Sequence, residues 1–115
     1  MTGEAKRVSI LGVKYKIVFD IPEDQMPENA DGCIDQSTHT IKVAKLESDR
    51  NSLQDMNEYR KKVVRHEIVH AFLYESGIWT CSGPVESWGC DEGITDWIAI
   101  QGPKLFDAFK EAGCL

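Results

Sequence analysis

The alternation of apolar and polar positions near the start of the chain predicts a β-strand. Residues 8–19 read VSILGVKYKIVF, and four apolar side chains fall at every second position: Val13, Tyr15, Ile17 and Phe19. A period of two built from β-branched and aromatic residues is typical of a strand with one wet face. Residues 21–32 contain two prolines and four acidic residues, which predicts a loop.

The next segment, residues 32–44, predicts a β-hairpin. A short strand around Cys33 and Ile34 is followed by a polar turn at residues 35–38 and a second strand with Ile41 and Val43 on one side. Because the strands are close together in the sequence, we expect them to form a small antiparallel sheet.

The second half of the chain predicts helices. Residues 53–76 contain neither proline nor glycine and are followed by Gly77, which predicts a helix of about 24 residues. Its second half, VVRHEIVHAFLY, is apolar almost all round, so we expect that half to be buried. Residues 91–100 predict a second helix, and residues 104–112, which follow Pro103, predict a third. Strands followed by helices indicate an α+β domain.

Composition and charge exclude several classes of partner. The 115 residues fit one domain, and 13 basic against 19 acidic residues give a formal net charge of −6. Such an acidic chain has no basic field to attract nucleic acid or an anionic membrane. No segment approaches the roughly 20 apolar residues of a membrane span, and the polar residues 1–7 do not predict a secretory signal. Since the four cysteines form no C-x-x-C pair, we expect reduced thiols and a cytoplasmic location.

The most informative motif is His66-Glu67-Ile68-Val69-His70, an H-E-x-x-H pattern within the long predicted helix. Residues four apart on a helix share a face, so both imidazoles can converge on one ion. Glu67, rotated by about 100° from His66, can reach a water molecule on that ion. The alternative is a set of ordinary helical residues, which would bury two histidines and a glutamate among apolar residues at considerable cost.

A catalytic zinc site needs a third protein ligand and an open position. The metzincin extension of the motif is excluded because residues 73 and 76 are leucine and serine. The better candidates are Glu92 and Asp96, which share one face of the second predicted helix. Glu86 is an alternative ligand, and an acidic first helical turn is an alternative explanation for Glu92 and Asp96.

Cysteines offer a different kind of site. Cys81 and Cys90 are alternative soft ligands, and a site made of histidine and cysteine would be structural instead of catalytic.

His66-Glu67-x-x-His70 followed by Glu92-x-x-x-Asp96 resembles the gluzincin arrangement, in particular the small phage- and prophage-encoded metallopeptidases related to the ImmA/IrrE type. The resemblance implies a zincin-like fold, with a small antiparallel sheet on the long motif helix and two C-terminal helices. It further implies that His66, His70 and Glu92 bind Zn²⁺, that Glu67 is the general base, and that Asp96 orients a ligating histidine.

The resulting hypothesis is a zinc metallopeptidase with a protein or peptide substrate, in which Glu67 takes a proton from a metal-activated water. One alternative is a non-catalytic metal-binding or protein-interaction module on a zincin scaffold. Another is a hydrolase that acts on a non-peptide amide.

Three further features are candidates for substrate contact. His39 lies in the predicted hairpin and Tyr74 follows His70 by four residues, although a turn histidine is often only solvated and Tyr74 fits helix packing equally well. An extended peptide could also pair with residues 40–44, provided that this strand lies at a sheet edge beside the metal.

Overall fold

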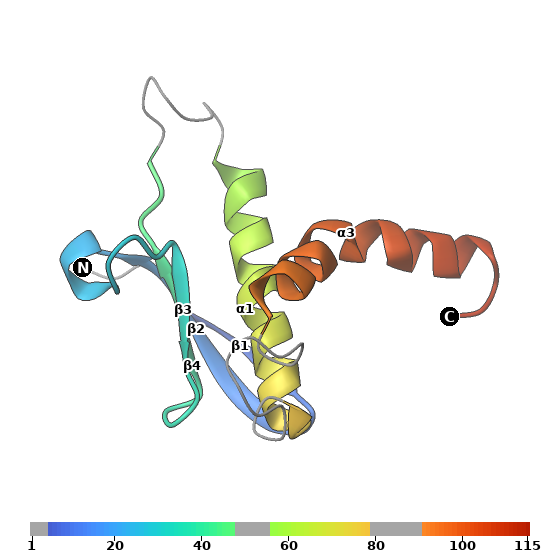
Figure 1. Ribbon diagram of the computed structural model, residues 1–115, viewed down its shortest axis with the longest axis horizontal. Coiled ribbons are helices and arrows are strands. Elements are labelled where there is room, and N and C mark those ends of the chain that lie inside the picture. The colour runs from blue at the N-terminus through green and yellow to red at the C-terminus, as the bar shows by residue number, and fades with distance from the viewer. Residues whose placement is uncertain (1–4, 48–55, 79–90) are drawn as a thin grey trace.

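The computed structural model describes residues 5–47, 56–78 and 91–115, and its fold is α+β as predicted. In these ranges, four strands form one sheet with the order β1-β2-β4-β3, and two α-helices follow. Helix α1 lies between the sheet and helix α3, and the C-terminal half of α3 points away from the rest of the protein (Figure 1).

The first strand segment is a hairpin and not the single strand that we predicted. Strands β1 (Ala5–Ile10) and β2 (Val13–Ile21) are antiparallel, and Ile10 pairs with Val13 across a two-residue turn. Leu11 and Gly12 both have positive φ, 49° and 87°. This backbone matches the twist of paired strands, but it usually requires glycine or asparagine at both positions. The prediction failed because leucine gives no turn signal.

The predicted hairpin of residues 32–44 is confirmed, but the sheet is mixed. Strands β3 (Gly32–Asp35) and β4 (Thr40–Ala44) are antiparallel, whereas β4 is parallel to β2. The loop that contains the short 3-10 helix η1 (Glu23–Gln25) is long enough to carry the chain across β4. Ile41 and Val43 are completely buried, so the apolar strand β4 is internal and the short strand β3 lies at the edge.

The core lies where the sheet meets α1 (Asn57–Glu75). The predicted inward face of β2 contributes Tyr15 and Ile17, and α1 contributes a stripe of buried residues with helical spacing: Val63, Glu67, His70 and Ala71. The second half of α1 is not buried all round, since Phe72 is 42% exposed. Glu67 and His70 are buried among these apolar residues, and burying polar side chains is unfavourable unless they have partners. Their burial therefore marks this part of α1 as a candidate functional site.

The ends of α1 agree in part with the prediction. Gly77 has a φ of 88° and donates its N–H to the carbonyl of Tyr74, so the predicted glycine stop is confirmed. Asn57 is the first helical residue, while the predicted start at residues 53–55 lies outside the described residues. Neither α1 nor α3 combines the length and the apolar character that a bilayer crossing requires.

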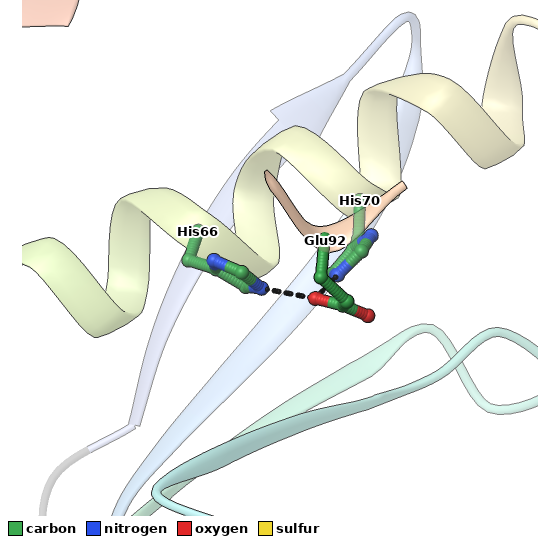
Figure 2. Close-up of side chains that lie close together, drawn as sticks. All are labelled: His66, His70 and Glu92. Atoms are coloured by element: carbon green, nitrogen blue, oxygen red, sulfur yellow. Dashed lines mark hydrogen bonds and ion pairs between the residues drawn. The ribbon is translucent and has the colours of Figure 1, made fainter. Parts of the chain in front are cut away.

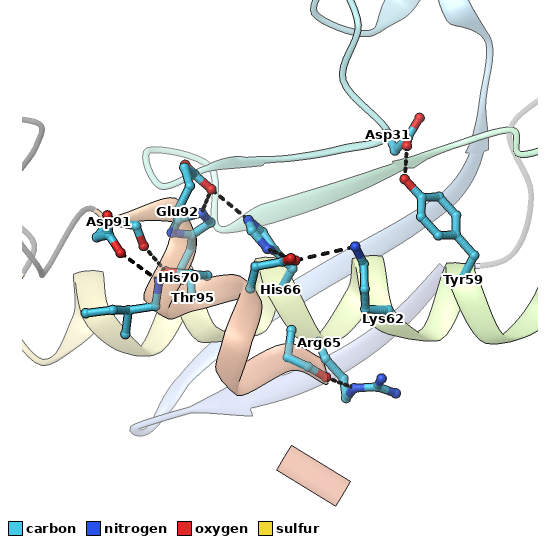
Figure 3. Close-up of polar contacts among 12 residues, drawn as sticks. Asp31, Tyr59, Lys62, Arg65, His66, His70, Asp91, Glu92 and Thr95 are labelled. Carbon is cyan, nitrogen blue, oxygen red and sulfur yellow. Dashed lines mark hydrogen bonds and ion pairs between the residues drawn. The ribbon is translucent and has the colours of Figure 1, made fainter. Parts of the chain in front are cut away.

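Helix α3 (Glu92–Glu111) continues through Pro103, so the prediction of two C-terminal helices is wrong. A proline lacks the N–H that would bond the carbonyl four residues earlier, here that of Ala99. In this fold, Arg65 Nε on α1 donates to the Ala99 oxygen instead (Figure 3). The interruption is therefore compensated by a neighbouring helix, which sequence patterns do not reveal.

This compensation predicts a stability change. Arg65→Met should lower the free energy of unfolding by about 1–3 kcal/mol, because the buried Ala99 carbonyl loses its partner. The cost should be smaller in a Pro103→Ala background, where residue 103 can supply the missing N–H. Urea unfolding of the four proteins measures this double-mutant cycle, and equal costs in both backgrounds would contradict the explanation.

Candidate metal centre

Two histidines of α1 direct their Nε2 atoms towards a common point. His66 and His70 are four residues apart on one helical face, and their rings lie edge to face with centroids 4.7 Å apart. His70 is 5% exposed, and the side chain of His66 is 17% exposed. Burial lowers the pKa of His70 although the charge of Glu92 opposes this, so the neutral form that binds metals is favoured.

Glu92 reaches both histidines from the first turn of α3. The side chain of Asp91 accepts a hydrogen bond from the backbone N–H of Ile94 at 2.7 Å, which caps the helix and fixes where it begins. Oε1 of Glu92 lies 2.8 Å from Nε2 of His66 and 3.0 Å from Nε2 of His70 (Figure 2). One carboxylate oxygen thus contacts both rings, although they are 26 and 22 residues away in the sequence.

The chemistry and spacing of these three atoms fit a zinc ion. All three lie within 4.8 Å of one another. Zinc in proteins binds imidazole nitrogen and carboxylate oxygen at about 2.0–2.2 Å, which places tetrahedral ligands about 3.3 Å apart. The observed separations of 2.8 and 3.0 Å need only a small expansion to reach that value. Two histidines and one carboxylate leave a fourth position for water or substrate.

Asp96 contacts the far side of His66. Its Oδ1 lies 3.2 Å from Nδ1 of His66 and 3.4 Å from Nζ of Lys62, and a dashed line in Figure 3 marks the ion pair of the Lys62 ammonium group. Burial opposes the shift, but His66 and Lys62 together hold the pKa of Asp96 below its ordinary value. A carboxylate in this position fixes the ring orientation of His66 with Nε2 turned to Glu92.

Asp96→Asn is expected to weaken zinc binding about tenfold to a hundredfold, because the amide orients His66 less strongly than the carboxylate does. Competition with a chromophoric chelator measures the affinity. Asp107→Asn on an exposed part of the same helix is the matched control and should leave the affinity unchanged. Equal affinities for both variants would contradict the orienting role.

Glu67 lies on the buried side of the motif. It is 6% exposed, and burial is the main reason why its pKa is raised to about 7. The charge of His66 acts against this shift and the charge of Glu92 adds to it. A carboxyl group whose pKa lies near neutrality is well suited both to accept and to return a proton.

A cavity of about 200 Å³ adjoins His66 and Glu67. It is lined by eight residues from α1, α3 and the start of β3: Asp31, Gly32, Tyr59, Lys62, Val63, His66, Glu67 and Asp96. A larger hollow of about 750 Å³ lies between residues 23–31 and 44–46 and contains none of the three clustered residues. The smaller cavity is the relevant one, because only it is lined by motif residues.

The structure bears differently on His39 and Tyr74, the two residues predicted to contact substrate. The ring of His39 packs against Tyr15, with centroids 5.2 Å apart, instead of joining the histidine pair, so this prediction is not supported. Tyr74 is half-buried, and its contact with substrate stays a prediction. The prediction for residues 40–44 is wrong, because β4 is flanked by strands on both sides.

Several alternatives fall outside the described residues, namely the ligands Glu86, Cys81 and Cys90. Of the cysteines in the described ranges, Cys33 and Cys114 are free thiols and belong to no metal-binding group. Sequence reasoning did not identify Lys62, Tyr59 or Gly32, which also line the cavity. The signal for Lys62 and Tyr59 was their helical spacing from His66 and Glu67, whereas nothing in the sequence marked Gly32.

Comparison with known proteins gives no further information: no protein family, no curated protein and no solved structure matches the chain.

Proposed function

We propose that the protein is a zinc-dependent metallopeptidase with a zincin-like fold, similar to the small phage-encoded gluzincins of the ImmA/IrrE type. The observation that carries this proposal is the convergence of His66, His70 and Glu92 at one point beside the buried Glu67. A protein or peptide is the proposed substrate, and the cytoplasm is the proposed location.

The proposed mechanism assigns each residue a task. Bound zinc would supply a Lewis acid that polarises the scissile carbonyl and acidifies a water molecule. His66, His70 and Glu92 would hold the ion, and Asp96 would orient His66. Glu67 accepts the proton from the water and returns it to the leaving amine, so that peptide-bond cleavage consumes one water molecule. The raised pKa of Glu67, about 7, suits both transfers.

The edge strand β3 supports a peptide substrate. Its outer side is unpaired in the described sheet, and its first residue, Gly32, lines the cavity together with Glu67. An extended peptide can add to such an edge by main-chain hydrogen bonds, which would bring its backbone past Glu67. We therefore propose that a peptide pairs with strand β3 and not with residues 40–44.

The main rival is a metal-binding module without catalysis. Glu67 favours the enzyme, because a carboxyl group that is 6% exposed and has a raised pKa is costly to keep. A purely structural zinc site needs only its ligands, and an apolar residue at this position would be more stable.

The test combines metal analysis with hydrolysis by the full chain. We expect about one zinc per chain, hydrolysis of unfolded fluorescein-labelled casein, loss of hydrolysis with 1,10-phenanthroline, and recovery with added Zn²⁺. Stoichiometric zinc without cleavage of casein or other unfolded proteins would instead support the binding module. Hydrolysis that resists chelation would contradict the proposed mechanism.

A further inference from the structure

One face of α1 holds the start of the edge strand against the motif. Tyr59, Val63 and Glu67 are spaced by four residues, so they lie in a row on that face. All three line the cavity together with Asp31 and Gly32. The row therefore faces the point at which the loop of residues 22–31 enters β3.

Gly32 comes unusually close to this row. A Cβ atom added at Gly32 would lie 2.7 Å from Cγ1 of Val63 and 3.1 Å from both Cγ and Oε2 of Glu67. The first distance is shorter than side chains tolerate, and the second requires the carboxyl group of Glu67 to move by a few tenths of an ångström. The backbone of Gly32 therefore lies directly against the side chain of Glu67.

A hydrogen bond of Asp31, the residue before Gly32, holds the backbone of Gly32 at this position. The hydroxyl of Tyr59 donates to Oδ2 of Asp31, as Figure 3 shows. The same bond raises the pKa of Tyr59 to about 12, with a smaller effect from burial, so the phenol stays protonated and keeps its donor. This bond thus holds Asp31 against α1, two helical turns from Glu67. Gly32 is the next residue in the chain.

We propose that Gly32, held in place through the Tyr59–Asp31 hydrogen bond, is a positioning residue that fixes the carboxyl group of Glu67 for proton transfer. This inference rests on the proposed peptidase function. Its physical basis is that a general base works only within a few tenths of an ångström of its required position. A glycine is needed because its backbone can support Glu67 without a side chain that would push it aside.

The test separates the effect on Glu67 from simple crowding. Gly32→Ala alone clashes with both Val63 and Glu67, whereas in Gly32→Ala/Val63→Ala the 2.7 Å clash is gone and only the contacts with Glu67 remain. The reference for the double variant is Val63→Ala. Gly102→Ala is the matched glycine control, because a Cβ at that position meets no atom within 4 Å.

We expect the double variant to bind zinc within twofold of Val63→Ala, to keep its KM for labelled casein, and to lose about tenfold in kcat. A kcat equal to that of Val63→Ala would overturn the inference, since the effect of Gly32→Ala would then be crowding by Val63 alone. A loss of zinc affinity in parallel with kcat would also overturn it, because it would show general damage to the site.

Tyr59→Phe tests the same proposal without adding any atom. It removes one hydroxyl group, and we expect kcat to fall severalfold at unchanged zinc affinity and KM. An unchanged kcat would overturn the role of the Tyr59–Asp31 bond. The two proposals fail differently: an inactive wild-type protein contradicts the peptidase function, whereas an active wild type with equally active variants contradicts only the role of Gly32.

Discussion

Replacing Glu67 by glutamine should abolish hydrolysis and leave zinc binding intact. Glutamine has the size of glutamate but cannot accept the proton of an attacking water molecule, so we expect kcat to fall by a factor of about 10²–10⁴. Glu67 belongs to no metal-binding group in the described residues, so the bound zinc should stay at about one per chain. Hydrolysis of labelled casein and zinc analysis on the same preparation measure the two quantities.

The thermal stability of Glu67→Gln shows whether a loss of hydrolysis comes from unfolding. Glu67 is 6% exposed and its pKa is raised to about 7, so a neutral amide at this position should not lower the thermal unfolding midpoint. Glu58→Gln, at an exposed position in the first turn of the same helix, should retain full activity. If Glu67→Gln cleaves casein at the wild-type rate, Glu67 is not the general base.

Replacing Glu92 by glutamine should weaken zinc binding by at least about a hundredfold. Its Oε1 is the atom that contacts Nε2 of both histidines, and the amide has neither the negative charge nor the affinity of a carboxylate ligand. Hydrolysis at limiting zinc should be lost in parallel. Titration with a chromophoric chelator as competitor gives the affinity.

This variant also tests the simplest alternative for Glu92, an acidic residue that only stabilises the first turn of α3. In that case Glu92→Gln would cost about 0.3–1 kcal/mol of stability and leave zinc binding unchanged. Glu111→Gln, at the other end of the same helix, controls for the general loss of one negative charge. Equal zinc affinities for Glu92→Gln and Glu111→Gln would remove Glu92 from the proposed site.

Local patterns in the sequence predicted the features that depend on neighbouring residues. The spacing of His66 and His70 placed both rings on one helical face, and the spacing of Glu92 and Asp96 did the same for the two carboxylates. The structure brings these four side chains together, with Glu92 against Nε2 and Asp96 against Nδ1 of His66. Helical periodicity is sufficient to group the two residues of each pair, because it does not depend on the tertiary fold. The approach of one pair to the other was expected only from the resemblance to gluzincins.

The wrong predictions and the unexpected contacts concern features that depend on residues far apart in the sequence. The continuation of α3 through Pro103 depends on Arg65, a residue of another helix. The parallel pairing of β4 with β2 places the strand that contains the completely buried Ile41 and Val43 inside the sheet, which proximity in the sequence does not predict. His39 lies in the predicted hairpin, but its ring packs against Tyr15 of β2. None of these contacts follows from local periodicity.

The close contact of Gly32 at the candidate site also could not be predicted from local sequence patterns. In the sequence it is one of nine glycines and lies at the end of an acidic loop. Only the packing of β3 on α1 shows that a single methyl group there would meet Val63 and Glu67. The residues that support a reactive group are harder to predict than the reactive group itself, because support depends on which elements are in contact.

The most direct measurement is a crystal structure of the zinc-loaded protein with anomalous diffraction recorded on both sides of the zinc absorption edge. We predict one strong peak at about 2.0–2.2 Å from Nε2 of His66, Nε2 of His70 and a carboxylate oxygen of Glu92, with water in the remaining position. A peak that lacks Glu92, or a zinc ion held by cysteine sulfur, would contradict it.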